Sequence, residues 1–260
     1  MSKYKQSVFT GAATAVITPF KNGNIDKESF GKIIESQIAG GIDAIVVAGT
    51  TGEAATLTHE EHMDCMKYVV DTVAGRVPVI AGTGSNDTAY GIELSQYACE
   101  IGADALLLVT PYYNKATPKG LIKSFLETAE KTTKPIILYN VPSRTGCNIT
   151  LPVYKELAKH ERVVAIGEIG LDYHYEDIPK EPQMLYFEKQ MELASKLNIP
   201  VIIHDREAHG DCLEMVKKFP GVKGVFHSFS GSGEMAKELV KLGWYISFSG
   251  TVTFKNARVP

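Results

Sequence analysis

Three side chains that can bind a metal ion each follow an apolar run typical of a β-strand. Glu168 ends the run VVAIGE, His204 ends VIIH and His227 ends GVFH. Because the carboxyl ends of parallel strands meet at one edge of a sheet, a barrel would gather these side chains at one rim. Two imidazoles and a carboxylate leave coordination positions open for water, which suits a single divalent ion such as Zn²⁺, Mn²⁺ or Mg²⁺. We expect no organic cofactor.

The elements that would position these residues alternate along the whole chain. Short β-branched runs, separated by amphipathic stretches, predict strands that begin at Ala13, Asp43, Val77, Asp104, Pro135, Val163, Pro200, Val222 and Trp244. Continuous apolar strands that alternate with helices indicate a parallel sheet covered on both faces, so the fold class is α/β. A doubly wound sheet is the alternative to a TIM-type (βα) barrel. We favour the barrel because about 250 residues is its usual size.

Three helices can be placed from the pattern. Thr58 and Glu61 form a capping box ahead of an apolar stripe. A helix that opens at Pro118 should bury one apolar face, made of Leu121, Ile122, Phe125, Leu126 and Ala129. A third helix is expected over 181–197. Nine strand candidates are one more than a barrel needs. If the strand of His227 closes the ring, the run from Trp244 to Gly250 is surplus and must pack outside the ring, pair with another chain or displace something.

Composition sets limits on partners and compartment. The chain has 260 residues, is 44% hydrophobic and carries a formal net charge of −3, which predicts a globular domain without a strong nucleic-acid footprint. No apolar stretch is long enough for a membrane span, and the first residues are too polar for a signal peptide. The four cysteines lack C-x-x-C spacing, so reduced thiols and a cytoplasmic location are expected.

The first part of the chain, from about residue 7 to 165, resembles dihydrodipicolinate synthase, within the pyruvate aldolase group that includes N-acetylneuraminate lyase. The motifs that carry the resemblance are GTTGE at 49–53, TPYYNK at 110–115 and YNVPSRTG at 139–146. The resemblance implies that Thr50, Tyr113 and Tyr139 form a proton relay, with Tyr113 reaching across the interface of a homodimer. It also implies that Thr51 contacts a keto-acid carboxylate and that Arg144 clamps the carboxylate of a second substrate, as a guanidinium can do with two hydrogen bonds.

One position departs from that family. The resemblance places the Schiff-base lysine at Gly167, in the strand VVAIGE. Glycine has no nucleophile, so no imine can form there.

From about Val163 onward, the chain instead resembles the TatD family of metal-dependent deoxyribonucleases and hydrolases. The segments VVAIGEIGLDYHY, NIPVIIHDREA, GVFHSFSGS and GWYISFSGTVTF follow its strands in order. The resemblance implies a two-metal site in which Glu168 bridges the metals and His204 and His227 complete one half. The other half needs an H-x-H on the opening strand, which here reads ATAVITPF, and an Asp on a later strand that the sequence does not reach.

Further polar residues surround these segments. The stretch DYHYED supplies Asp172, His174, Glu176 and Asp177, which we expect in a solvated loop. Asp205 and Arg206 follow His204 and are expected to orient it.

The two resemblances overlap only at VVAI. We therefore expect one hybrid barrel domain, 1–260, in which residues 1–165 supply synthase-like βα units 1–5 and residues 166–260 supply TatD-like units. Three functions remain open: a scaffold without either parental activity, a weak single-metal phosphoesterase or deoxyribonuclease, and a residual lyase or binder of a small keto acid.

Overall fold

The computed structural model describes residues 8–9, 12–161, 163–175 and 178–248. The chain divides into two compact units, Met1–Val164 and Ala165–Pro260. The boundary falls within strand β8 (Val163–Asp172), in the segment where the two family resemblances meet. The expectation of a single hybrid barrel domain stays a prediction.

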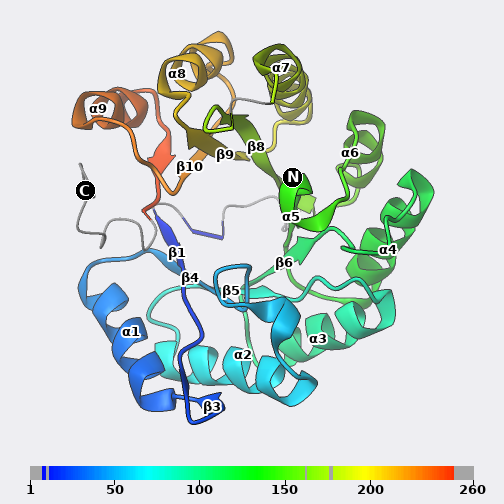
Figure 1. Cartoon of the computed structure of the whole chain (residues 1–260), viewed down its shortest axis with the longest axis vertical. Helices are drawn as coiled ribbons and strands as arrows, with labels where there is room; N and C mark the ends of the chain where they lie inside the picture. Colours follow the sequence, from blue (N-terminus) through cyan, green and yellow to red (C-terminus); the bar gives the residue numbers. More distant parts are fainter. Residues whose placement is uncertain (1–7, 10–11, 162, 176–177, 249–260) are drawn as a thin grey trace. The chain divides into compact units, whose positions relative to one another are not determined.

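The first unit contains the first five expected strands, all parallel and adjacent in chain order. They are β1 (Ala13–Ala15), β4 (Ala44–Val47), β5 (Val79–Gly82), β6 (Ala105–Val109) and β7 (Ile136–Tyr139). The helices between them are α1 (Lys27–Ala39), α2 (His59–Val73), α3 (Thr88–Glu100) and α4 (Pro118–Lys131). In Figure 1 these helices lie outside the strands of their own unit. Nearly every residue of β4 and β5 is buried, as expected of strands covered on both faces.

The second unit contains the other four expected strands. After β8 come β9 (Val201–Arg206), β10 (Gly224–His227) and β11 (Tyr245–Ile246), all parallel. The helices are α7 (Lys180–Leu197), α8 (His209–Lys218) and α9 (Gly233–Lys241). These alternating strands and helices confirm the α/β class in each unit.

The surplus ninth strand is not excluded from the sheet. Strand β11 pairs with β10 in parallel, with Val225 opposite Tyr245 and Phe226 opposite Ile246. The preceding Trp244 is buried, and its ring lies 5.6 Å from that of Phe226. This aromatic contact anchors the strand within its own unit. The end of the expected run, Ser249 and Gly250, lies outside the described residues.

The hairpin of β2 (Phe20–Lys21) and β3 (Asn24–Ile25) was not expected. Asn22 and Gly23, at its turn, have φ values of 53° and 77°. Two positive φ values in a two-residue Asn-Gly turn match the twist of the flanking strands. The dipeptide was therefore a usable signal for the hairpin.

The expected helices form, with one difference in burial. In α2, the Thr58 hydroxyl accepts from the Glu61 amide and the Glu61 carboxylate accepts from the Thr58 amide, so the capping box is confirmed. The helix expected over 181–197 is α7. In α4, Leu121, Phe125 and Ala129 are buried, whereas Ile122 and Leu126 are only half-buried. The buried face of α4 is therefore narrower than the sequence pattern indicated.

Short helices complete the first unit: the 3₁₀ turn Ala54–Thr56, α5 (Pro142–Thr145) and α6 (Leu151–Leu157). All four cysteines are free thiols. Among the helices of the described part of the chain, none combines the length and apolar character needed to cross a membrane.

The capping box predicts a measurable loss of stability. We expect T58A to lower the free energy of unfolding by about 1 kcal/mol, because the backbone amide of Glu61 loses the Thr58 hydroxyl that accepts from it. The control T72A makes the same change inside α2, where alanine favours the helix, and should not destabilise the protein. Urea unfolding followed by circular dichroism measures both. An equal loss in the two variants would contradict a capping role for Thr58.

Candidate functional site

Glu168, His204 and His227 come from three neighbouring strands of the second unit. Glu168 lies in β8, His204 in β9, and His227 is the last residue of β10. The register pairs His227 directly with His204. Because both residues lie on the same face of neighbouring strands, their imidazoles emerge together.

A β-bulge brings Glu168 to the histidines. Ile166 pairs with Val201 and Ile169 pairs with Ile203, so Gly167 and Glu168 together oppose the single residue Ile202. A bulge of this kind bends its strand and redirects a side chain. The Glu168 carboxylate lies with Oε2 3.3 Å from Nδ1 of His204 and Oε1 3.8 Å from Nε2 of His227.

Glu168 lies within ion-pair distance of both histidines. The side chain of Glu168 is 17% exposed, and those of His204 and His227 are 35% and 36% exposed, so solvent reaches all three. Within the described ranges, no group of three or more His, Cys, Asp or Glu side chains is arranged to hold a metal ion. The structure therefore brings the expected trio together without the geometry of a metal centre.

Asp172 joins this cluster, contrary to the expectation that it lies in a solvated loop. It is the last residue of β8, and its Oδ2 lies 3.2 Å from Nε2 of His204. Its other oxygen, Oδ1, accepts from the backbone amide of His174. Glu168 and Asp172 are four residues apart after the bulge, so strand alternation puts them on one face. That spacing was the signal that could have found Asp172. Glu176 and Asp177 of the same stretch lie outside the described residues.

The two carboxylates set the protonation of His204. Burial by itself lowers the pKa of this imidazole, but hydrogen bonds and charge from Glu168 and Asp172 outweigh burial and raise the pKa above its ordinary value of 6.5. The two carboxylates thus favour the protonated form of His204. A protonated imidazole cannot bind a metal, so this arrangement favours the proton over the metal until pH rises.

Asp205 does not orient His204 as expected. Asp205 is one residue further along β9, so its side chain points to the opposite, buried face, where Ile203 also lies. There its Oδ2 lies 2.9 Å from Nδ1 of His209, the first residue of α8. Arg206 is exposed, and its guanidinium lies 5.7 Å from the ring centre of Tyr175.

Gly167, at the position that the synthase resemblance assigns to a lysine, is packed so that no side chain fits. A Cβ built on Gly167 would lie 2.6 Å from Cβ of Ile202 and 3.1 Å from its Cγ1 and Cδ1. Real Cβ contacts are not that short, and Cβ of Ile202 is fixed to the backbone of β9. The bulge that directs Glu168 toward the histidines therefore also removes the room for a nucleophile.

The synthase-like residues belong to the first unit and follow the carboxyl ends of its strands. Thr50 and Thr51 come after β4, Tyr113 comes after β6, and Tyr139 ends β7. Tyr113 is 89% exposed, and its φ is 71°. Arg144 is exposed on α5. The structure places all five on the side of the strands where barrel enzymes carry their sites.

Comparisons with known proteins divide the chain in a similar way. The model of the dihydrodipicolinate synthetase family matches residues 8–187, and the model of the TatD related DNase family matches residues 148–259. Both models therefore match residues 148–187, a longer overlap than the segment VVAI.

Several similar proteins are synthases. The 4-hydroxy-tetrahydrodipicolinate synthase of Acetivibrio thermocellus is 53% identical over 168 residues, which are 65% of this chain and 58% of that protein. The dihydrodipicolinate synthase structure from Aquifex aeolicus has a TM-score of 0.70 at 35% identity, over 94% of this chain and 70% of that one. The chloride-inhibited enzyme from Acinetobacter baumannii, complexed with pyruvate, has a TM-score of 0.68 at 34% identity, over 93% of this chain and 70% of that one.

This chain spans little more than half the length of the Acetivibrio relative. The synthase family model nevertheless matches more than half of the chain. The chain therefore belongs to the dihydrodipicolinate synthetase family.

Proposed function

We propose that this chain is a hybrid of synthase-type and TatD-type βα units, joined in one barrel, that carries out neither parental reaction in full. The single observation that supports this most is the packing of Gly167 against Ile202. Synthase chemistry by imine formation needs an amine at that position, and the Ile202 side chain leaves no space for one.

Neighbouring lysines offer no replacement. Lys155 lies on α6 and is exposed. Lys159 follows the same helix, and its amine is 2.6 Å from the Glu156 carboxylate, with 68% of the Lys159 side chain exposed. A nucleophilic lysine needs a desolvated pocket or a neighbouring cation, and the surroundings of Lys155 and Lys159 supply neither.

The same proposal leaves a binding role for the first unit. Thr50, Thr51, Tyr113, Tyr139 and Arg144 supply the hydroxyls and the guanidinium that a small keto acid requires, and the pyruvate complex of the Acinetobacter enzyme supports this ligand class. We propose residual keto-acid binding, without carbon–carbon bond formation, as the activity of this unit. The exposure of Tyr113 supports a homodimer in which its ring finds a partner. Four free thiols support a reducing, cytoplasmic compartment.

The second unit supports one alternative, a weak single-metal phosphoesterase or deoxyribonuclease. Its support is the convergence of Glu168, His204 and His227. A two-metal site does not fit, because β1 reads ATA and supplies no histidine pair. A single ion would be held by those three side chains after their ion pairs separate, and it would lower the pKa of a bound water to about 7. Asp172 would then keep the His204 ring in place.

The hybrid proposal predicts no synthase turnover. Incubation of the purified chain with pyruvate and aspartate semialdehyde should give product no faster than a protein-free blank, because the imine cannot form. The 53% identical Acetivibrio synthase is the control that shows the assay works. Turnover by this chain that R144A diminishes would contradict the proposal.

The packing of Gly167 can be tested separately. We expect G167A to lower the free energy of unfolding by about 1–3 kcal/mol, since its Cβ would overlap Ile202. G221A is the matched control, because a Cβ on Gly221 meets nothing within 4 Å. Denaturant unfolding measures both variants. If G167A were as stable as G221A, the position would have room for a side chain and the proposal would lose its main support.

The metal alternative predicts pH-dependent zinc binding. Because Glu168 and Asp172 raise the pKa of His204, Zn²⁺ must displace a proton, and its affinity should fall as pH falls below the raised pKa. H227A should abolish binding. H174A should not, because His174 is half-exposed and pairs with Glu207. Titration calorimetry at several pH values measures this, and the absence of binding at every pH would reject the alternative.

A further inference from the structure

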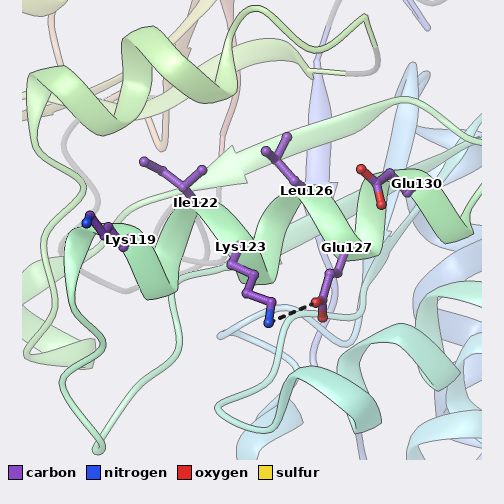
Figure 2. Close-up of a pocket in the computed structure, with 6 residues that line it drawn as sticks. All are labelled: Lys119, Ile122, Lys123, Leu126, Glu127 and Glu130. Atoms are coloured by element: carbon purple, nitrogen blue, oxygen red, sulfur yellow. Dashed lines mark ion pairs between the residues drawn. The ribbon is translucent and has the colours of Figure 1, made fainter.

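The outer face of α4 carries an apolar groove. Ile122 and Leu126, which the sequence pattern assigned to the core, are half-buried there instead. The groove is open and measures about 350 Å³. It is lined by residues of α4 alone: Lys119, Ile122, Lys123, Leu126, Glu127 and Glu130 (Figure 2).

The rest of α4 is occupied within the first unit. Leu121, Phe125 and Ala129 are buried in the core, and the Ser124 hydroxyl accepts from Thr88 of α3. The six groove residues recur at intervals of three and four, which places them in one stripe along the helix. The stripe is therefore a face that the unit itself leaves partly open.

The charges along this stripe are ordered by sign. Lys119 and Lys123 lie toward the start of α4, and Glu127 and Glu130 lie toward its end (Figure 2). Ile122 lies between the two lysines, and Leu126 lies between Lys123 and Glu127. A stripe that is positive at one end and negative at the other is complementary to itself when reversed. A two-fold contact requires that kind of self-complementary surface.

We propose that α4 pairs antiparallel with α4 of a second copy of this chain. Around a two-fold axis near the middle of the stripe, Lys119 of one copy faces Glu130 of the other. Lys123 faces Glu127, and Ile122 packs on Leu126. Each of the three pairings places the two-fold axis at nearly the same point along α4. The three positions agree to within about one residue, or about 1.5 Å of helix rise.

The charged side chains of the stripe reach solvent and can form ion pairs with a second copy of the chain. Within one chain, Lys123 Nζ lies 3.6 Å from Glu127 Oε1, with 78% and 39% of the two side chains exposed. That pair is long and solvated, so exchange for a partner's charge costs little. The contact is also small, since a standard interface has about 20 to 30 residues a side. The pairing is therefore weak and depends on protein concentration.

Charge reversal tests the proposal on the full chain. K119E/K123E makes the stripe entirely acidic, and E127K/E130K makes it entirely basic. We expect each variant alone to raise the dimer dissociation constant by about tenfold or more, because like charges then face each other. An equimolar mixture of the two variants should associate at least as tightly as the unaltered chain. The control K32E/K67E makes the same change in net charge on α1 and α2 and should change nothing.

Sedimentation velocity over a concentration series, at low and at high salt, measures the self-association of all five samples. Pairing through α4 is supported if each variant alone fails to associate, the mixture of the two variants associates, and high salt abolishes the association of the mixture. A chain that is monomeric throughout the series overturns the proposal. So does self-association that neither variant weakens, because all of that association then uses another surface, such as the one around Tyr113. Circular dichroism of each variant shows that loss of association is not loss of fold.

Discussion

The close approach of β8 to β9 at Gly167 is the constraint on which the chemistry of this chain depends. Two residues of β8 face one residue of β9, and a Cβ at the first of the two would overlap Ile202. Glycine is needed here for space, because the nearest atom belongs to a neighbouring strand and cannot rotate away. The chain belongs to the synthetase family mainly through its first unit, and we propose that it lacks the family's reaction. The position that the resemblance assigns to the nucleophile, Gly167, lies in the second unit, where β8 pairs with β9 through a bulge.

The same bulge produces the arrangement of charges that the second unit presents. It turns Glu168 toward His204 and His227. Asp172 lies further along the same face, and its carboxylate contacts Nε2 of His204, whereas Glu168 contacts Nδ1. Two carboxylates around one imidazole hold a proton well, and a metal must compete with that proton. The cluster is therefore best described as a hydrogen-bonded ion network from which a metal site could be made.

Much of the architecture could be predicted from sequence, because continuous apolar runs and helix caps are local signals. The strands beginning near Ala13, Asp43 and Val77 were read from such runs, and the Thr58 capping box formed as expected. The convergence of Glu168 with the two histidines was expected because each follows an apolar run, although Glu168 and His204 lie within β8 and β9 and only His227 ends its strand. Where the pattern is local, few competing interactions can change the outcome.

The errors came from contacts that no local pattern reports. Apolar spacing cannot tell whether Ile122 meets a core or an open groove, since that depends on what neighbouring elements cover. Asp205 was assigned to His204 by adjacency, although strand alternation turns it to the buried face toward His209. Asp172 was assigned to a loop because the length of β8 was underestimated. Each is a question of which face a side chain occupies, and tertiary packing decides it.

Reductive trapping tests the central claim most directly. Pyruvate and borohydride are added to the intact chain, and its mass is measured, since reduction would make any imine a permanent adduct on a lysine. We predict no added mass, because the position that would carry the amine is Gly167 and has no room for a side chain. A pyruvate-derived adduct mapped to any one lysine would contradict the account.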